Sequence, residues 1–584
     1  MDDQRVSPRF VRALNLADLL EGQSRAVNLE GNLIALFNSG GRVFAVDNRC
    51  PHMGFPLDRG SVKDCILTCH WHHARFDLAT GGTFDQWADD VRAFPVRVEK
   101  GVIWIDLAEQ GNFRERQTQR LGDGLERNLS LVIAKSVIAL LERGEADPVV
   151  PFRKGLDFGA RNRREGWGSG LTTLTCMMNL VPWLDPADRS RALYQGLASV
   201  AEDCVGNPPH FTIRSLPGAG GELEKLKRWL RQFVEVRDAE GAERCVTSAV
   251  RAGASQSDLA AMMFAAATDH RYLTTGHVLD FTNKAFEALD HAGWDRAEVV
   301  LASLARSYAD GERMEESNQW RHPVDLIAIL DRAFEAMAPA IESGRGARRP
   351  WIGAGALVSI ILGDDPEAIA EAMLTALREG CTPDELGGAV AYAAAMRIAR
   401  FHTSNEFGDW DTAHHSFTFS NAVHQGLRRA PSVELLRGAF DGAMSVYLNR
   451  FLNIPAARIP HPNGSSRPPQ QVLAELPGLF DRQQQVNEAG TLIAEHFATH
   501  GDDRALIAAL GHALLREDRD FHSIQGLEAA VRQYAYLGRG EAGANVLIAT
   551  ARYLAAHAPT PRAQGQTFRI AERLFRGDRL FEGE

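Results

Sequence analysis

The pattern of hydrophobic and polar residues divides the chain into two regions with different periodicity. Up to about residue 108, short runs alternate apolar and polar side chains and are separated by turn-forming stretches such as residues 38–41 and 81–82. A period of two residues is typical of strands that bury one face, so this region is predicted to be a small all-β domain. Its expected strands are residues 24–29, 32–37, 43–46, 65–68, 91–98 and 102–106.

From about Phe113 onward the periodicity changes. Long segments rich in Ala and Leu carry apolar residues three and four positions apart, for example residues 125–143 and 367–379. This spacing predicts amphipathic helices, and alternating β-branched runs are scarce. The predicted fold class is therefore multidomain, with a small all-β domain followed by a large all-α domain.

The helical region also repeats itself along the sequence. Pairs of segments align without gaps and share motifs such as Arg-x-Gly-x-[Ser/Thr]-x-x-[Asp/Glu]-Leu and His-x-x-x-Phe-x-Asn. The pairs are residues 242–259 with 369–386, 276–289 with 414–427, and 363–379 with 501–517. Such self-similarity predicts helical hairpins that stack side by side. The expected organisation is a β domain at 1–108, a helical connection with a first helical unit at 109–233, repeat A at 234–345, repeat B at 346–470 and a partial repeat C at 471–584.

Composition limits the function classes that are open to the chain. With 584 residues, a net charge of −11 and an isoelectric point near 6.0, the chain is expected to form several domains and to bind no nucleic acid. No apolar run reaches the ~18 residues that cross a bilayer and no signal-peptide pattern is visible, so no membrane association is expected. Seven scattered cysteines favour free thiols in a reducing compartment, and the predicted location is the cytoplasm.

Two short motifs in the β region carry the clearest chemistry. Cys50-Pro-His52 is followed, after sixteen residues, by Cys69-His-Trp-His72. Each motif offers one thiolate and one imidazole, which is the set that holds a 2Fe–2S cluster with both sulfurs on one iron and both nitrogens on the other. Zinc is the alternative, since two Cys and two His also form a zinc site, although zinc fingers place Cys with Cys and His with His.

On these motifs, residues 1–108 resemble a Rieske ferredoxin. The respiratory members of that family carry an extra cysteine in each loop, and this chain has Phe55 and Trp71 there, so it is more similar to the branch of ferredoxins and ring-hydroxylating oxygenases. His73 departs from the family, which usually has glycine after the last ligand. The resemblance implies a 2Fe–2S cofactor on Cys50, His52, Cys69 and His72. No nucleotide-binding fingerprint is visible, so an external reductase or ferredoxin is the expected electron donor.

A second metal site is predicted in the helical region. Rieske oxygenases pass electrons to an iron held by two His and one carboxylate, and the Asp411–His414 spacing matches only part of their motif. Histidines and carboxylates are nevertheless dense between residues 402 and 424, and His277 aligns with His415 in the repeats. Helical bundles hold one iron or a pair of irons with inward His and Glu, whereas most single histidines in such helices are surface or core residues. The candidate ligands are His277, Glu315, His402, Glu406, His414, His415 and His424, with a weaker group that includes His512, His522 and Glu528.

Two functions remain open. The first is an oxidoreductase in which the cluster relays electrons to non-haem iron in the helical domain for the oxygen-dependent oxidation of a small organic substrate. The second is an electron carrier or redox sensor whose helices form a non-catalytic scaffold that binds a partner. Residues 377–386 also resemble the helical hairpin of carboxymuconolactone-decarboxylase-like and alkylhydroperoxidase-like proteins, but the chain has no Cys-x-x-Cys pair, so peroxidase activity is not implied.

Overall fold

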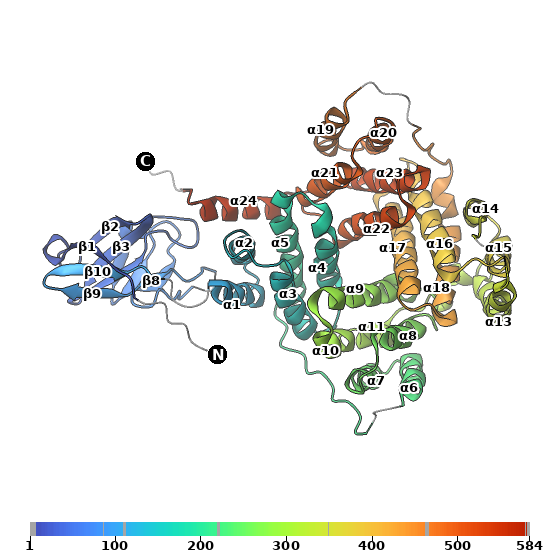
Figure 1. Ribbon diagram of the computed structural model, residues 1–584, viewed down its shortest axis with the longest axis horizontal. Helices are drawn as coiled ribbons and strands as arrows, with labels where there is room; N and C mark the ends of the chain where they lie inside the picture. The colour runs from blue at the N-terminus through green and yellow to red at the C-terminus, as the bar shows by residue number, and fades with distance from the viewer. Residues whose placement is uncertain are drawn as a thin grey trace. The chain divides into compact units, whose positions relative to one another are not determined.

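The computed structural model describes residues 8–85, 87–108, 113–218, 222–347, 350–461, 467–578 and 580. The chain divides into two compact units, one formed by Met1–Lys154 together with Gln564–Glu584 and the other by Gly155–Ala563. Figure 1 shows strands only in the N-terminal, blue part of the chain, with helices in the rest of the described residues. The predicted fold class is confirmed.

Three antiparallel sheets form the β part of the first unit, in the orders β1-β10-β9, β2-β3-β4-β8 and β5-β6-β7. The expected strand at residues 91–98 is two short strands, because Pro95 interrupts the ladder between them. The strands are β1 (Phe10–Asn15), β2 (Ser24–Leu29), β3 (Asn32–Ser39), β4 (Arg42–Asp47), β5 (Ser61–Lys63), β6 (Ile66–Thr68), β7 (Arg75–Asp77), β8 (Ala93–Phe94), β9 (Val96–Glu99) and β10 (Val102–Asp106).

Strand β3 separates two hydrophobic cores of this unit. Ile34 and Leu36 point into one core, which they share with residues of β10, whereas Ala35 and Phe37 point into the other. Successive side chains of a strand face opposite sides, so the buried run of β3 serves both cores. The second core includes Cys50 and Cys69, so the two cluster motifs rest on the packed interior of the domain.

Helices complete the first unit. They are α1 (Phe113–Glu126), α2 (Ser130–Ile138) with a π-helical turn at Ala139–Arg143, and α24 (Ala563–Arg576) from the far end of the chain. Arg49, which precedes the first motif, donates to the carbonyl oxygen of Leu574 in α24 at 3.0 Å. Helix α3 (Val149–Asn162) contains the boundary between the two units.

All regular secondary structure in the described residues of the second unit is helical. Several helices begin at side chains that cap them, such as Ser255 and Thr382, each in a reciprocal capping box. The helices are α4 (Ser169–Leu180), α5 (Pro186–Asp203), α6 (Leu223–Glu235), α7 (Ala239–Arg251), α8 (Gln256–Ala267), α9 (His277–Ala292), α10 (Ala297–Ala302), α11 (Ala305–Asp310), α12 (Asn318–Arg321), α13 (Leu326–Gly344), α14 (Ala354–Ile361), α15 (Pro366–Arg378), α16 (Pro383–Ala399), α17 (Phe407–Arg429), α18 (Val433–Leu448), α19 (Pro469–Phe480), α20 (Val486–Ala498), α21 (Asp503–Leu515), α22 (Phe521–Leu537) and α23 (Glu541–Ala556).

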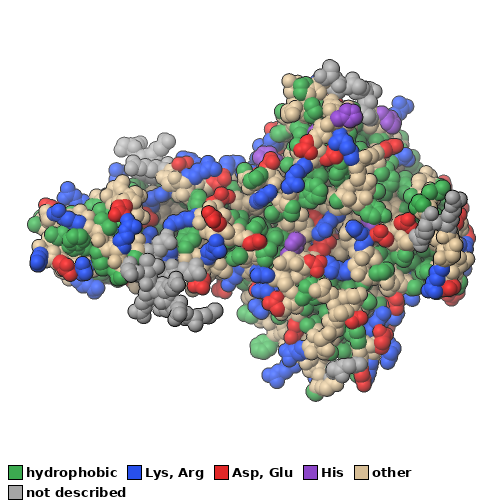
Figure 2. Space-filling view, viewed as in Figure 1, with side chains coloured by type: hydrophobic (Ala, Val, Ile, Leu, Met, Phe, Trp, Pro, Cys, Tyr) green, Lys and Arg blue, Asp and Glu red, His purple; other side chains and the backbone are tan. Residues whose placement is uncertain are grey.

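Four of these helices frame the interior of the second unit. Helix α9 packs on α4 and α17, and α22 packs on the same two helices. In Figure 1, α9 in green and α22 in red span the space between α4 in teal and α17 in orange. Lys, Arg, Asp and Glu side chains are interspersed over the visible face of this unit (Figure 2). No helix in the described part of the chain combines the length and the hydrophobicity needed to cross a bilayer.

Candidate metal centres

The first cluster motif lies in a tight loop after β4. The amide of Cys50 donates to the carbonyl oxygen of Phe55 at 2.8 Å, and the amide of Gly54, at φ +82°, donates to the carbonyl oxygen of Cys50 at 2.8 Å. Inside this turn, the backbone amides of His52 and Met53 donate to the Cys50 sulfur. Amide donors stabilise negative charge on sulfur, so the loop is shaped to hold a thiolate.

The second cluster motif joins β6 to β7 in a similar way. The amide of Cys69 donates to the carbonyl oxygen of Ala74 at 2.8 Å, and the amides of Trp71 and His72 donate to the Cys69 sulfur. His73 adopts φ +62°, a left-handed conformation that glycine reaches at no steric cost. This conformation is the physical reason for the glycine that is usual at this position in the family that the motif resembles.

The four predicted donors converge as a pair of sulfurs and a pair of imidazoles. The hydrogen bond between the two thiols raises the pKa of Cys50 and lowers the pKa of Cys69 to about 6. The ring centroids of His52 and His72 are 4.7 Å apart. Burial lowers the pKa of His52 to about 4, and its Nδ1 atom has no hydrogen-bond partner among the described residues. A buried nitrogen of this kind is explained when it is a metal ligand.

The arrangement fits two irons better than one zinc ion. The two thiols lie within hydrogen-bond distance of each other and the two imidazole rings are neighbours, so like donors are paired, as on the two irons of a mixed-ligand cluster. Two thiolates beside two neutral imidazoles are the donors that a mixed-ligand 2Fe–2S cluster requires. Cys50 and Cys69 are only 3% and 1% exposed, but His72 is exposed and His52 half-buried, so the imidazole side of the site faces solvent.

One buried cation lies next to the first loop. The Nζ atom of Lys135, in α2, donates to the carbonyl oxygen of Pro51 at 2.7 Å and lies 3.6 Å from a carboxylate oxygen of Asp89, which also pairs with Arg120. Burial lowers the pKa of Lys135 to about 8. The sequence motif holds no signal for this residue, because Lys135 lies 84 residues beyond Pro51 in a different element.

An all-β domain that presents two thiolates and two imidazoles on paired loops defines the class of 2Fe–2S proteins with mixed Cys and His ligands. The family model described as Rieske [2Fe-2S] domain matches residues 9–95. The ferredoxin component of the naphthalene 1,2-dioxygenase system of Pseudomonas putida is 31% identical over 101 residues, which are 17% of this chain and 97% of that protein. Through its N-terminal domain, the chain belongs to the Rieske [2Fe-2S] family.

Further relatives match in the same part of the chain or extend beyond it. The 3-phenylpropionate/cinnamic acid dioxygenase ferredoxin subunit of Escherichia coli K12 is 37% identical over 101 residues, covering 17% of this chain and 94% of that protein. Human Apoptosis-inducing factor 3 is 31% identical over 198 residues, 34% of this chain and 30% of that protein. Among solved structures, the Sphingomonas yanoikuyae B1 ferredoxin is 30% identical and wholly covered by 17% of this chain, with a TM-score of 0.17.

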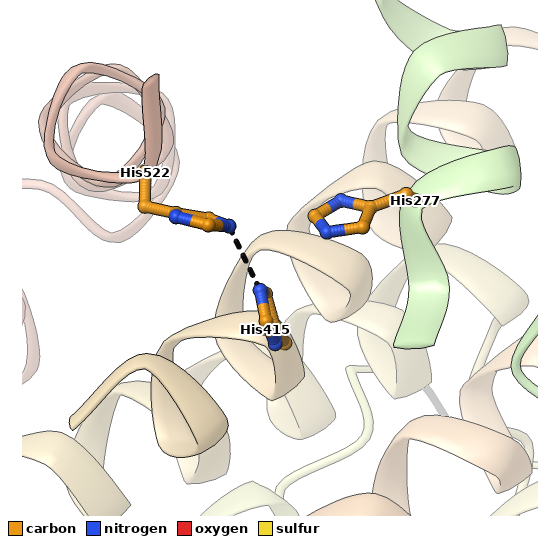
Figure 3. A group of neighbouring side chains, drawn as sticks. All are labelled: His277, His415 and His522. Atoms are coloured by element: carbon orange, nitrogen blue, oxygen red, sulfur yellow. Dashed lines mark hydrogen bonds between the residues drawn. The ribbon is translucent and has the colours of Figure 1, made fainter. Parts of the chain in front are cut away.

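A second group of donors lies in the helical unit. His277 at the start of α9, His415 in α17 and His522 at the start of α22 each offer a ring nitrogen, and these three atoms lie within 4.8 Å of one another. The rings point into a common space from three helices, as Figure 3 shows. The Nε2 atoms of His415 and His522 are 2.9 Å apart, within hydrogen-bond distance. Two predicted ligands, His277 and His415, are thus brought together with a third residue from the weaker predicted group.

The backbone that leads into His277 is strained. Tyr272, Thr274 and Thr275 have φ of 46°, 49° and 51°, and Gly276 follows at 94°. A β-branched residue at positive φ is a genuine outlier, and such strain persists only where surrounding contacts enforce it. The amide of Thr274 donates to the carbonyl oxygen of Glu312 at 2.7 Å. A Cβ at Gly276 would lie 2.9 Å from the Cβ of Phe419, so α9 can begin here only with glycine before the histidine.

The three histidines are half-buried, and two of them, His277 and His415, have lowered pKa values that keep their rings uncharged near neutral pH. Burial, followed by the neighbouring imidazoles, lowers the pKa of His277 to about 3 and that of His415 to about 4. Phe281 and Phe521 flank the His277 ring, with centroids 5.4 and 5.5 Å away. Neutral imidazoles in a partly apolar setting are the form in which histidine binds metal ions.

The other predicted ligands lie elsewhere in the second unit. Glu315 accepts a bond from His270 at 2.7 Å, His402 bonds Ser404 at 2.8 Å at the surface, and Glu406 caps the start of α17. His424 contacts Asp384 at 3.1 Å, away from the three-histidine group. His414 is buried beside the group: its ring stacks on Tyr553 at 4.5 Å and lies 6.0 Å from the His522 ring.

Proposed function

We propose that the protein is an iron–sulfur oxidoreductase. Its N-terminal cluster, held by Cys50, His52, Cys69 and His72, would take electrons from an external reductase or ferredoxin. It would relay them to a non-haem metal in the helical unit for the oxygen-dependent oxidation of a small organic substrate. A bound cluster of this type exchanges one electron at a time.

One observation carries the electron-transfer part of the proposal. The thiol pair is buried in the domain core and supported by four backbone amides, whereas the imidazole pair reaches the surface. A buried half resists hydrolysis and oxidation of the ligands, and an accessible half gives a redox partner a short path to the site. Trp87, whose ring lies 4.9 Å from that of His52, is 43% exposed and widens this accessible face.

The relatives support external redox partners. The P. putida and E. coli proteins are named as the ferredoxin component and ferredoxin subunit of dioxygenase systems. A ferredoxin component exchanges electrons with separate proteins, so the same role for residues 9–95 implies a donor outside this chain. The cytoplasm remains our predicted location, from the cysteine usage alone.

A second function is also tested, because the match to the ferredoxin relatives uses only 17% of this chain and leaves the helical unit without a counterpart in them. In those proteins a domain of this size is the entire named component. Here the helical unit would be a scaffold for a partner, and the cluster an electron carrier or redox sensor.

Metal analysis and single-turnover oxidation of the full-length protein distinguish these functions. Two irons per chain and a rhombic paramagnetic signal after reduction are expected from the cluster alone, and a further metal ion from the oxidoreductase. The cluster should then be reduced, freed of reductant and mixed with oxygen. Faster reoxidation in the wild type than in His415→Ala supports the oxidoreductase, and equal rates support the carrier. A Cys69→Ser protein that keeps the signal would refute the cluster assignment.

A further inference from the structure

The three-histidine group is assembled from parts of the chain that are far apart. His277, His415 and His522 are separated by 138 and 107 residues, yet their ring nitrogens lie within 4.8 Å of one another. Each stands on a different helix, and two of those helices begin at the histidine or one residue before it. Three helices rarely bring imidazoles to one point unless the rings share a ligand, because apolar side chains would fill the space at lower cost.

The distances suit a single ion with an open position. Ligand nitrogens about 2.0 Å from a tetrahedral ion are roughly 3.3 Å apart. The His415 and His522 nitrogens are 2.9 Å apart and the third lies within 4.8 Å, so the separations come within about 1.5 Å of that value. Three imidazoles leave the fourth position free for water or substrate, as in catalytic sites.

The surroundings also orient the ligands. Asp520 caps α22 by accepting from the amide of Ser523 at 2.9 Å, and its second oxygen is 3.8 Å from Nδ1 of His522. A carboxylate behind a histidine fixes its tautomer and leaves Nε2 for the metal. His414 lies behind His522, and its buried Nε2 has no hydrogen-bond partner within the described residues.

Two polar side chains, Asp280 and Gln525, follow His277 and His522 by about one helical turn and form a layer, the Asp280–Gln525 layer. Asp280 in α9 accepts a hydrogen bond from Gln525 in α22, and the two residues are 1% exposed. They stand three positions after His277 and His522, so the same two helices carry both layers. Burial raises the pKa of Asp280 well above its usual value, and the neighbouring Lys284 offsets part of this shift. Its Oδ1 atom has no hydrogen-bond partner among the described residues.

We propose that His277, His415 and His522 bind one redox-active divalent transition-metal ion, iron or copper, above the Asp280–Gln525 layer. All-nitrogen donors select ions of this borderline class and not Ca²⁺ or Mg²⁺. Three nitrogen ligands that converge on one position can bind a single ion, whereas a pair of irons would need bridging carboxylates. The choice of a redox-active ion rests on the proposed function, but the binding site itself does not.

Metal binding by the full-length protein tests this assignment without any substrate. Protein stripped of loosely bound ions, with its cluster still intact by absorption, is titrated with Zn²⁺ or Co²⁺ as probes and analysed for metal content. Wild type should bind one probe ion per chain. His415→Ala and His522→Ala should weaken binding by more than about 100-fold, because loss of an outer-shell partner alone costs 10–100-fold. His402→Ala is the matched control and should bind like wild type, since His402 lies at the surface on Ser404.

A measurement on unmodified protein covers the case in which a variant does not fold. Histidine acylation followed by peptide mapping should show His415 and His522 protected by the probe ion, and His402 modified with or without it. Equal probe affinity in wild type and His522→Ala, or no protection of His415, would overturn the site. A wild type that binds the probe ion but whose cluster is reoxidised by oxygen no faster than that of His415→Ala would overturn the proposed function and leave the site standing.

Discussion

Lys135 should set the reduction potential of the cluster. Its ammonium is largely buried and donates at 2.7 Å to the carbonyl of Pro51, the residue between the ligands Cys50 and His52. A positive charge stabilises the reduced cluster, which carries one more negative charge. The substitution Lys135→Met removes the charge and keeps much of the side-chain volume, so the potential should fall.

The magnitude follows from Coulomb's law. A contact with the carbonyl of the next residue places Nζ roughly 8 Å from the Cys50 sulfur. At an effective dielectric constant of about 20, a unit charge at this distance contributes about 2 kcal/mol. For one electron, a tenfold change in equilibrium constant is 59 mV, so the contribution is about 90 mV. Asp89 lies 3.6 Å from Nζ and cancels part of it. We expect a fall of about 40–90 mV.

Redox titration of the full-length protein, followed by absorption and paramagnetic resonance, measures this shift. Lys100→Met is the control, since Lys100 is exposed in the β9–β10 turn and its charge is screened by solvent. The control should move the potential by less than about 10 mV. A Lys135→Met protein with a full cluster and an unchanged or higher potential would refute the reasoning.

Three further substitutions test the packing and electrostatics of the two units. His73→Gly relieves a left-handed backbone at φ +62° and should raise the free energy of unfolding of the cluster domain by about 1 kcal/mol, seen as a higher unfolding temperature. A marked fall in that temperature would show that the His73 side chain makes a needed contact. Lys284→Met removes a fully buried cation from Glu287 and Glu528 and leaves Arg532 beside both; it should cost about 3 kcal/mol in denaturant unfolding, against less than about 1 kcal/mol for Lys225→Met at a partly exposed ion pair. Burial, only partly offset by Arg271, raises the pKa of Asp441 to about 7. Protonation of Asp441 therefore stabilises the folded state at low pH, by at most about 4 kcal/mol, and this contribution is lost as pH rises from about 4 through 7. Asp441→Asn should flatten this part of the stability profile between pH 5 and pH 8, and an equal difference from wild type at both pH values would contradict the assignment.

The β domain could be predicted because its signals are local. Cys50, His52, Cys69 and His72 lie within 23 residues, and the turns around them follow from nearby Gly and Pro. Strands β1, β5 and β7 were not predicted; β5 and β7 have three residues each, which are too few to show a period of two. Helix formation in the second unit was predictable for the same reason as the β domain, from periodicity within single segments.

Local density of histidines was a poorer guide to the three-histidine group. Residues 402–424 concentrate such side chains, but α17 winds about 100° per residue, so they face different neighbours. His424 lies nine positions after His415, about half a turn around the helix, and contacts Asp384. The residue that completes the group, His522, stands in a segment with no comparable density. A usable signal was the shared spacing of His277 with Asp280 and of His522 with Gln525.

That shared spacing extends along both helices and explains how distant histidines meet. Asp280 bonds Gln525, Lys284 bonds Glu528, and Glu287 lies 3.6 Å from Arg532, each pair 244 or 245 residues apart like His277 and His522. These contacts form a polar seam between α9 and α22, on the faces that the two helices turn toward each other. Sliding one helix by a turn would bury a cation or carboxylate without its partner, at a cost of several kcal/mol. The seam therefore sets the register of the two helices, and the register places His277 opposite His522.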